Sequence, residues 1–187
     1  MAVTALDPRT ALIIVDLQKG VVGLDLAHPV EEVVANSRRL AGAFREHGLP
    51  VVLINVDGMA PGRTERHRAG GSRPDDWTEL VSELGAQPTD LRVTKQTWGA
   101  FASTDLEQRL KGLGVTQVVI TGIATTAGVE STARQAYEAG FNVALATDAM
   151  TDMSGEAHDC SVANVFPKLG ETGTTDEILG LLDRADA

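Results

Sequence analysis

The chain has 187 residues, of which 43% are hydrophobic and 22% are charged, and these values are ordinary for a globular protein. Its formal net charge of −10 argues against nucleic acid as a partner, because binding to phosphates requires a basic face. No segment approaches the roughly 20 apolar residues of a membrane span, which argues against a membrane partner.

The length predicts one domain, residues 1–187, with a core large enough to be stable on its own. The N-terminal residues MAVTALDPRT do not combine a basic region with an apolar one, so we expect no signal peptide and a cytoplasmic location. The single cysteine, Cys160, excludes an intrachain disulfide and a cysteine-based zinc site.

Apolar runs and helical patterns alternate along the chain. The apolar runs are continuous, which indicates strands that are buried on both faces, as in a parallel sheet. Strands are expected at residues 11–16, 50–56, 90–94, 117–121 and 142–147. Helices are expected at 29–47, 77–84, 104–111, from about 129, at 155–166 and at 174–184, with a short extended piece near 168–171. This order predicts a doubly wound α/β sheet with helices on both faces.

Three threonines are placed to cap helices. The segments 104–107 and 174–177 each begin with Thr and end with Glu, which is the pattern of a capping box. Thr126 lies in a turn rich in Gly, Ala and Thr, residues 122–128, that leads into the helix from about 129. Its hydroxyl is expected to accept a hydrogen bond from an amide in the first turn of that helix.

Functional side chains are expected where the strands end. Ligands of open parallel sheets bind beyond the carboxyl ends of the strands, at the switch point of the strand order. Asp16 ends the first strand, Lys95 follows the third, and the turn 122–128 follows the fourth. The first amides of the helix after this turn have no intrahelical partner and favour negative charge. Each feature also has an ordinary interpretation: a cap, a solvated lysine and a plain connection.

The segment 57–76 is the longest stretch without periodicity, and loops of this length are often functional lids or else disordered. It is basic within an acidic protein. Two interpretations stay open, a solvated surface loop or a lid that clamps a carboxylated substrate through bidentate arginine contacts. Its basic residues are Arg63, Arg66, His67, Arg68 and Arg73.

Four segments together resemble the isochorismatase-like hydrolase superfamily, and the resemblance covers nearly the whole chain. The resemblance implies a three-layer α/β/α sandwich on a mainly parallel sheet, a small-molecule substrate, no cofactor and a homo-oligomer of two or more copies. It also implies that Asp16 and Lys95 are two members of the catalytic set. The four segments are IIVDLQ at 13–18, TKQTWGAF at 94–101, VITGIATTAGVESTARQAYEAGF at 119–141 and TDAMTD at 147–152.

The chain departs from the superfamily pattern at a third catalytic position, Gly128. Most members, including nicotinamidases and carbamoyl hydrolases, place a cysteine nucleophile at the start of the helix after the turn. Glycine cannot attack a carbonyl, so the cysteine route of amide cleavage is lost. Cys160 lies in a later expected helix, where it is interpreted as a small, partly buried residue. The true isochorismatases are similar to this chain in having glycine at that position.

The isochorismatase reaction that this resemblance implies needs no protein nucleophile. A vinyl ether is protonated at its terminal carbon, water adds to the oxocarbenium-like species, and the hemiketal collapses to pyruvate and a dihydroxy product. Asp16 is expected to be the general acid, and Lys95 is expected to orient the substrate or tune Asp16. A nearby cation lowers the pKa of Asp16 whereas burial raises it, and a general acid must hold its proton near pH 7. The sequence leaves open which effect is larger.

The turn is expected to bind substrate through its backbone. The resemblance implies a cis peptide bond near Ile123-Ala124, which would aim the amides of Ala124 and Gly128 into the pocket to hold a carboxylate or carbonyl oxygen. Thr125 is expected to contact the substrate beside them.

Other candidate substrate contacts have two interpretations each. Trp98 and Phe101 form either an apolar wall or a subunit contact, and Gln18 either reaches the pocket or caps a turn. Arg63 is expected to contact the substrate as part of the basic loop. No metal is expected, because the stretch 55–57, Asn-Val-Asp, lacks the His of the Asp-x-His motif that nicotinamidases use.

Three functions stay open on this evidence. The first is a hydrolase that lacks the cysteine and cleaves a small, carboxylated substrate by vinyl-ether hydrolysis. The second is an amide or other C–N hydrolase that uses activated water. The third is a non-catalytic binding protein on the same scaffold, which would show no turnover and no response to Asp16→Asn.

Overall fold

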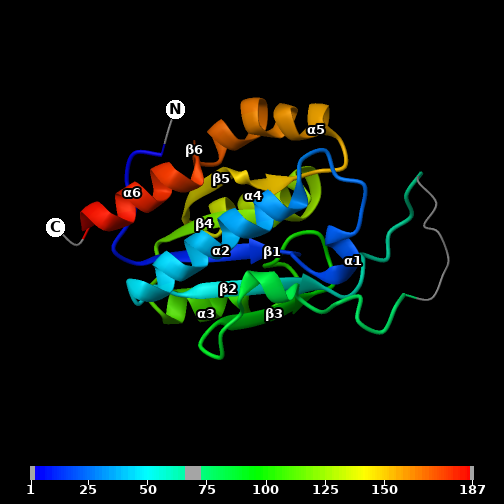
Figure 1. Ribbon diagram of the computed structural model, residues 1–187, viewed down its shortest axis with the longest axis horizontal. Coiled ribbons are helices and arrows are strands. Elements are labelled where there is room, and N and C mark those ends of the chain that lie inside the picture. The colour runs from blue at the N-terminus through cyan, green and yellow to red at the C-terminus, as the bar shows by residue number, and fades with distance from the viewer. Residues whose placement is uncertain (1–2, 66–72, 186–187) are drawn as a thin grey trace.

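The computed structural model describes residues 3–65 and 73–185 of the chain. The central element of the protein is a six-stranded sheet in which all neighbouring strands run parallel (Figure 1). The predicted α/β fold with a parallel sheet is confirmed. Across the sheet, the strands lie in the order β3 (Leu91–Lys95), β2 (Val51–Val56), β1 (Thr10–Val15), β4 (Gln117–Ile123), β5 (Asn142–Thr151) and β6 (Glu171–Gly173).

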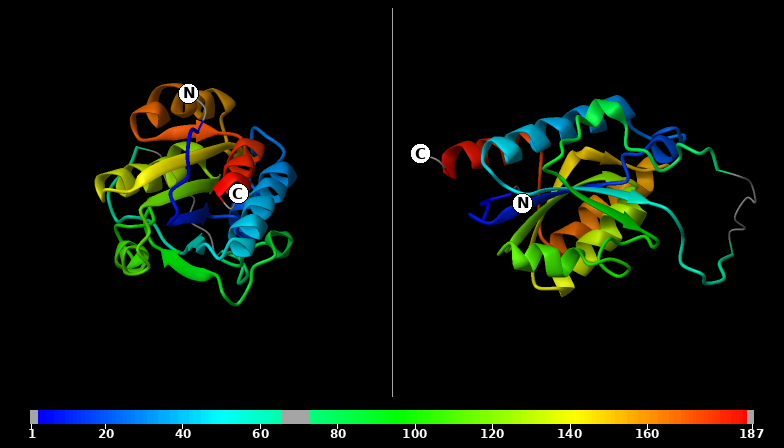
Figure 2. Two further views of the ribbon diagram at one scale, coloured as in Figure 1. Left: turned by 90° about the vertical axis from the view of Figure 1, so that its left-hand side faces the viewer. Right: turned by 90° about the horizontal axis from the view of Figure 1, so that it is seen from below.

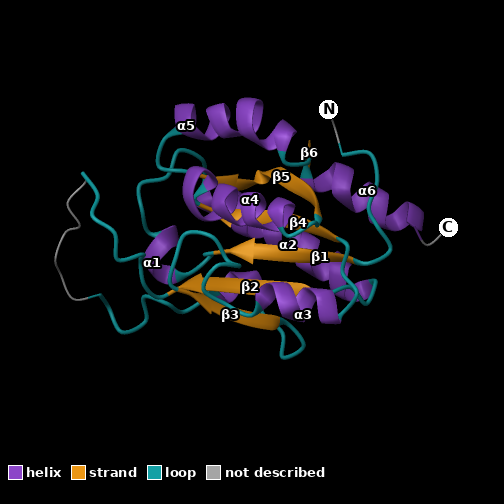
Figure 3. Ribbon diagram, turned by 180° about the vertical axis from the view of Figure 1, so that it is seen from behind, coloured by secondary structure: helices purple, strands orange, loops and turns teal. Residues whose placement is uncertain are grey.

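Helices cover both faces of the sheet and make it the middle of three layers, as predicted. Helices α2 (Val30–Glu46) and α6 (Thr175–Ala185) lie together on one face, as Figure 2 shows. Helices α3 (Leu106–Gly112) and α4 (Glu130–Glu138) lie on the other face (Figure 3). Among the described residues, no helix is long and apolar enough to cross a membrane. The shorter helical segments are α1 (Lys19–Val22), η1 (Ser82–Leu84), η2 (Thr125–Val129), α5 (Gly155–Cys160), η3 (Ser161–Val165) and η4 (Phe166–Lys168).

Strand β1 shows why the apolar runs are continuous. All six of its residues are buried, and its alternate side chains enter two separate apolar clusters. Ala11, Ile13 and Val15 pack in the cluster that includes α3 and α4. Leu12 and Ile14 pack in the cluster that includes α2 and α6. Because both faces bury side chains, the strand has no position at which a polar residue would reach water.

The strand order places a switch point between β1 and β4. From β1 the chain continues to β2 and β3 on one side, and from β4 it continues to β5 and β6 on the other. Strands β1 and β4 pair from Thr10↔Gln117 to Val15↔Gly122, so Asp16 and the turn after β4 begin at the same edge. Crevices at such a switch point are where open parallel sheets bind ligands.

Strand β5 is longer than expected. It was expected to end at residue 147, but it extends to Thr151 with a break in its pairing with β4, which resumes at Gly122↔Met150. Asp148 therefore lies within the strand. Its Oδ1 accepts hydrogen bonds from the amide and hydroxyl of Thr175, which ties β5 to the start of α6.

The prediction of a helix at 77–84 is wrong for residues 77–81, since within this range only the 3₁₀ turn η1 is helical. The backbone of the preceding residues pairs with the segment after β1 instead. The amide of Gly20 donates to Trp77 O at 3.0 Å, and the amide of Lys19 donates to Glu79 O at 2.8 Å. A helix would need the carbonyl oxygens of Trp77 and Glu79 as acceptors for its own amides, but here both accept hydrogen bonds from the segment after β1.

One of the two predicted capping boxes forms and the other does not. At the start of α6, the amide of Thr174 donates to Glu177 Oε2 at 2.8 Å, and the amide of Glu177 donates back to Thr174 Oγ1 at 3.3 Å. At the start of α3, Thr104 Oγ1 accepts from the amide of Leu106 instead. Glu107 turns toward Lys111, with which it forms an ion pair at 2.6 Å.

Glu177→Ala is expected to lower the free energy of unfolding by about 1 kcal/mol, because the amide of Thr174 loses its acceptor. Glu107→Ala is the matched control, since it removes only an exposed i,i+4 ion pair worth about 0.3–0.5 kcal/mol. Urea denaturation of both variants measures the difference. Equal losses in the two variants would contradict the capping box at 174–177.

Candidate active site

Asp16, Lys95 and Gly128 meet at the carboxyl ends of the strands. Asp16 directly follows β1 with a positive φ of 54°, Lys95 ends β3, and Gly128 lies in η2 after β4. Lys95 Nζ donates to Asp16 Oδ2 at 2.6 Å. A Cβ atom added at Gly128 would lie 3.1 Å from that same oxygen. The structure therefore brings together the three residues that sequence reasoning placed in one site.

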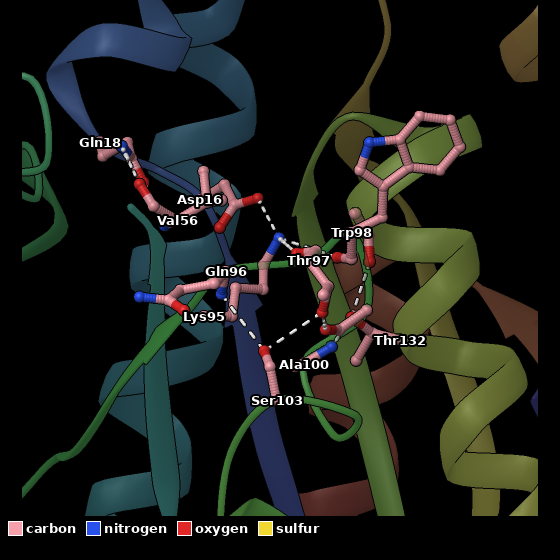
Figure 4. A network of polar contacts seen from close by, with 12 residues as sticks. Asp16, Gln18, Val56, Lys95, Gln96, Thr97, Trp98, Ala100, Ser103 and Thr132 are labelled. Carbon is pink, nitrogen blue, oxygen red and sulfur yellow. Dashed lines mark hydrogen bonds and ion pairs between the residues drawn. The ribbon is translucent and has the colours of Figure 1, made fainter. Parts of the chain in front are cut away.

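The ammonium group of Lys95 is fully engaged (Figure 4). It is 1% exposed, and besides Asp16 it donates to Trp98 O at 2.8 Å and Thr97 O at 3.3 Å. A lysine ammonium has three hydrogens, so these three acceptors use all of them. The position of Nζ is consequently set by Asp16 on one side and by the backbone of the loop after β3 on the other.

The carboxyl group of Asp16 holds its proton more strongly than an exposed aspartate. Burial raises its pKa from 3.8 to about 6, and Lys95 acts in the opposite direction through its charge and its hydrogen bond. The competition that the sequence left open is decided in favour of burial. Oδ1 is buried and has no hydrogen-bond partner among the described residues. Because Oδ2 accepts from Lys95, Oδ1 is the oxygen on which a proton can reside.

The turn after β4 has the backbone that the resemblance implied. The Ile123–Ala124 peptide bond is cis, and residues Thr125–Val129 form one π-helical turn. The expectation that Thr126 caps this helix is wrong. Its hydroxyl and its amide both donate to Asp152 Oδ2 at 2.7 Å. A carboxylate from the end of β5 therefore satisfies the start of the turn, as negative charge does at helix N-termini.

Asp152 is a residue whose role the sequence reasoning missed. It is 3% exposed and follows Thr151, the last residue of β5. The segment TDAMTD at 147–152 was part of the resemblance, but no role was predicted for Asp152, because the strand was expected to end at residue 147. Only the pairing of β5 with β4 shows that this acid reaches the turn.

The hydroxyl of Thr125 is occupied inside the protein. Thr125 is fully buried, and its Oγ1 lies 2.8 Å from His158 Nδ1. The His158 ring lies 4.7 Å from the His28 ring, and His28 Nδ1 lies 2.9 Å from Thr151 Oγ1. Burial, followed by His28, lowers the pKa of His158. The Thr125 hydroxyl, which was expected to contact substrate, is therefore engaged by the buried His158 ring.

Two further expected substrate contacts are structural in the protein. Gln18 is fully buried, its Nε2 donates to Val56 O and Trp77 O, and its Oε1 accepts from the Val56 amide. It thus clamps the end of β1 to β2. Phe101 is buried in the apolar cluster with α3 and α4, 5.9 Å from the Phe141 ring. Neither side chain is free to form a pocket wall.

A cavity of about 780 Å³ adjoins the loop that holds Lys95. Trp98 is 59% exposed and lines it, while its carbonyl oxygen binds Lys95. Arg63 also lines it. The other lining residues are Met59, Ala60, Gly62, Thr64, Glu65, Thr97, Gly99, Ser131 and Gln135.

Arg73, another basic residue of the loop, does not line this cavity. Arg73 lies 3.7 Å from Asp57 Oδ1 and stacks at 4.2 Å over the Trp77 ring, so it anchors the end of the loop. Arg66, His67 and Arg68 lie outside the described residues. Within residues 3–65 and 73–185, no group of three His, Cys, Asp or Glu side chains is arranged to hold a metal ion.

Cys160 is exposed near the end of α5. Its Sγ lies 3.7 Å from Asn164 Nδ2, one helical turn further along the chain. None of its contacts involves Asp16, Lys95 or Gly128. The structure thus gives this thiol no place in the three-residue set.

Lys95→Met is expected to raise the pKa of Asp16 above its value of about 6, because burial remains while the neighbouring cation is removed. NMR titration of the Asp16 carboxyl carbon measures this pKa directly. Lys111→Met is the control, since Lys111 is an exposed partner of Glu107. A pKa for Asp16 that falls or stays unchanged in Lys95→Met would show that Lys95 does not stabilise the ionised carboxyl.

The comparisons with known proteins identify the family of the chain. Residues 10–177 match the isochorismatase domain. The isochorismatase family protein YwoC of Bacillus subtilis is 42% identical over 178 residues, 91% of this chain and 93% of that protein. The solved structure of an isochorismatase family protein from Burkholderia thailandensis matches 97% of this chain and 100% of its own chain, with a TM-score of 0.93 and 37% identity. The ureidoacrylate amidohydrolase of Variovorax paradoxus is 29% identical over 91% of this chain and 80% of its own length. The chain therefore belongs to the isochorismatase family and is a hydrolase of that family.

Proposed function

We propose that this hydrolase works without a cysteine nucleophile and cleaves a small, carboxylated substrate by vinyl-ether hydrolysis, with Asp16 as the general acid. The observation that carries the proposal is the position of Gly128. A side chain there would touch Asp16 Oδ2, at the place where a nucleophile would stand, and glycine supplies none. The single cysteine of the chain lies elsewhere, in α5.

The protonated carboxyl group of Asp16 starts the reaction. Its proton moves from Oδ1 to the terminal carbon of the vinyl ether, and the former double-bond electrons form the new C–H bond. The adjacent carbon becomes an oxocarbenium-like centre, to which water adds with loss of a proton. The resulting hemiketal breaks its C–O bond, which yields pyruvate and a hydroxyl group on the other product. The proton lost by the water restores the neutral Asp16.

Lys95 stabilises the charge that this step creates. Asp16 becomes a carboxylate as it gives up its proton, and Lys95 Nζ already lies 2.6 Å from Oδ2. The interaction therefore grows stronger toward the transition state without a movement of the donor, which is how preorganised electrostatic groups increase rates. Burial raises the pKa of Asp16 to about 6 and so increases the protonated fraction of the ground state, whereas Lys95 limits the cost of ionisation.

We place the body of the substrate in the cavity beside the Lys95 loop. Asp16 and Gly128 are not among the residues that line it, so the reacting end of the substrate must extend beyond the cavity toward Asp16. The cavity volume of about 780 Å³ is within the usual range of small-molecule sites. Trp98 offers an apolar surface to a ring, and Arg63, which lines the same cavity, offers a cation to a carboxylate. We place the amides of Ala124 and Gly128 on a second oxygen of the substrate. We also retain the proposal of a homo-oligomer, which sedimentation analysis tests.

The isochorismatase of Bacillus subtilis, 29% identical over 97% of this chain and 61% of its own length, supports the vinyl-ether reaction. The amidohydrolase relative favours a second candidate, C–N hydrolysis by activated water. The two reactions place opposite demands on Asp16. Vinyl-ether cleavage needs it protonated, whereas activation of water needs its carboxylate as a base.

Incubation of the protein with isochorismate is expected to release pyruvate faster than the spontaneous reaction, followed by a coupled dehydrogenase. Asp16→Asn is expected to lower kcat about 10²–10⁴-fold, because asparagine cannot donate the proton. Cys160→Ala is the matched control and is expected to keep full activity. A large loss in Cys160→Ala, or no pyruvate above the spontaneous rate, would overturn the proposal; ureidoacrylate and nicotinamide serve as the C–N substrates.

The pH dependence of kcat/KM gives a separate test. Because the active form is the protonated one, kcat/KM is expected to be constant below about pH 6 and to fall about tenfold per pH unit above it. A rise of kcat/KM through the same region would instead indicate the carboxylate as a base and support the C–N hydrolase. No turnover of any of these substrates, with Asp16→Asn behaving like the wild type, would indicate a binding protein.

A further inference from the structure

Two side chains of helix α4 accept hydrogen bonds from the backbone of the loop after β3. Thr132 Oγ1 accepts from the Ala100 amide at 3.2 Å. Gln135 Oε1 accepts from the next two amides, those of Phe101 at 2.9 Å and Ala102 at 3.3 Å. Positions 132 and 135 are three residues apart and share one face of the helix. Two side-chain oxygens thus satisfy three consecutive amides of the loop.

The loop passes close to the end of the Gln135 side chain at position 99. A Cβ atom added at Gly99 would overlap the Gln135 carboxamide, so a larger residue there would displace this side chain from the loop amides. The carbonyl oxygen of Gly99 also accepts from Thr97 Oγ1 at 3.0 Å. The backbone of the loop is therefore held both within itself and against α4.

Thr132 connects this loop to the turn that carries Gly128. Its hydroxyl donates to Gly128 O at 2.6 Å while it accepts from the Ala100 amide. A threonine hydroxyl has one hydrogen and two lone pairs, so it can make both bonds at once. Thr132 is fully buried, as is Ala100, so no water is at hand to replace either bond.

The same loop fixes Lys95. Figure 4 shows Lys95 between Asp16 on one side and the backbone of Thr97 and Trp98 on the other, with Thr132 bonded to Ala100 beyond them. Two of the three acceptors of Nζ are carbonyl oxygens of this loop. A shift of the loop therefore moves the ammonium group relative to Asp16.

We propose that Thr132 and Gln135 are positioning residues that hold the loop Thr97–Ala102 in place and thereby keep Lys95 against Asp16. Neither side chain needs to touch the reacting atoms for this role. The inference rests on the proposed function of Asp16 and Lys95, but it does not depend on the identity of the substrate.

Loss of the Thr132 hydroxyl leaves the Ala100 amide without an acceptor in a buried place. Such a group costs about 1–3 kcal/mol, and the loop lowers this cost by moving until the amide finds another partner. Lys95 is the only charged group among the described residues that shifts the pKa of Asp16. A weakened contact with Lys95 therefore lets burial raise this pKa further.

The test is NMR titration of the Asp16 carboxyl carbon, which requires no substrate and no turnover. Thr132→Val keeps the shape of the side chain and removes the hydroxyl, and Gln135→Met keeps its length and removes the acceptor. Thr132→Ser restores a hydroxyl. Thr10→Val is the matched control, because Thr10 is also fully buried and hydrogen-bonded but begins β1, about 20 Å from Asp16.

Thr132→Val and Gln135→Met are each expected to raise the pKa of Asp16 by about half a unit or more, toward its value in Lys95→Met. Thr132→Ser and Thr10→Val are expected to leave it at the wild-type value. Wild-type pKa values in both Thr132→Val and Gln135→Met would overturn the inference, as would a rise of equal size in Thr10→Val. Because the titration is independent of catalysis, failure of the proposed reaction leaves this result interpretable.

Discussion

The contact between Lys95 Nζ and Asp16 Oδ2 is the interaction on which the rest of the site depends. Both groups are almost completely buried, and bringing two charges out of water is costly unless they pair closely and their other bonding positions are satisfied. Lys95 meets this condition with its two carbonyl acceptors. Asp16 meets it only in part, because Oδ1 has no described partner. Burial raises the pKa of Asp16 from 3.8 to about 6, so this carboxyl group gains and loses its proton just below neutral pH.

The sheet determines why this pair forms at all. Lys95 ends β3 and Asp16 follows β1, and β2 lies between these strands. Adjacent strands are about 4.8 Å apart, so the long lysine side chain crosses the end of β2 to reach its partner. On the other side of Asp16, strand β4 leads into the turn with Gly128. At the switch point, the carboxyl of Asp16 therefore lies between the ammonium group of Lys95 and the backbone of Gly128, which has no side chain.

The surroundings of the pair are held by polar side chains that the helices and β5 contribute. Asp152 fixes the start of the turn, and Thr132 joins the turn to the loop that binds Lys95. On the far side of β1, Gln18 clamps the strand end to β2. Each of these side chains satisfies backbone groups that would otherwise be buried without partners, so the rigidity of the site follows from ordinary hydrogen-bond requirements.

The amino-acid sequence by itself determined that the sheet is parallel and which residues follow the ends of its strands. Continuous apolar runs indicated a parallel sheet, and the acid, the cation and the glycine turn at their ends indicated one site, because parallel strands present their carboxyl ends at one edge. The capping box at 174–177 was also readable, since all of its bonds are local. Only the tertiary structure decided which distant segment each of these side chains contacts. Thr126 bonds to Asp152 and Phe101 turns into the core, because partners from distant segments outweigh local capping or an exposed position. Burial, which no local pattern measures, decided that the pKa of Asp16 is raised rather than lowered.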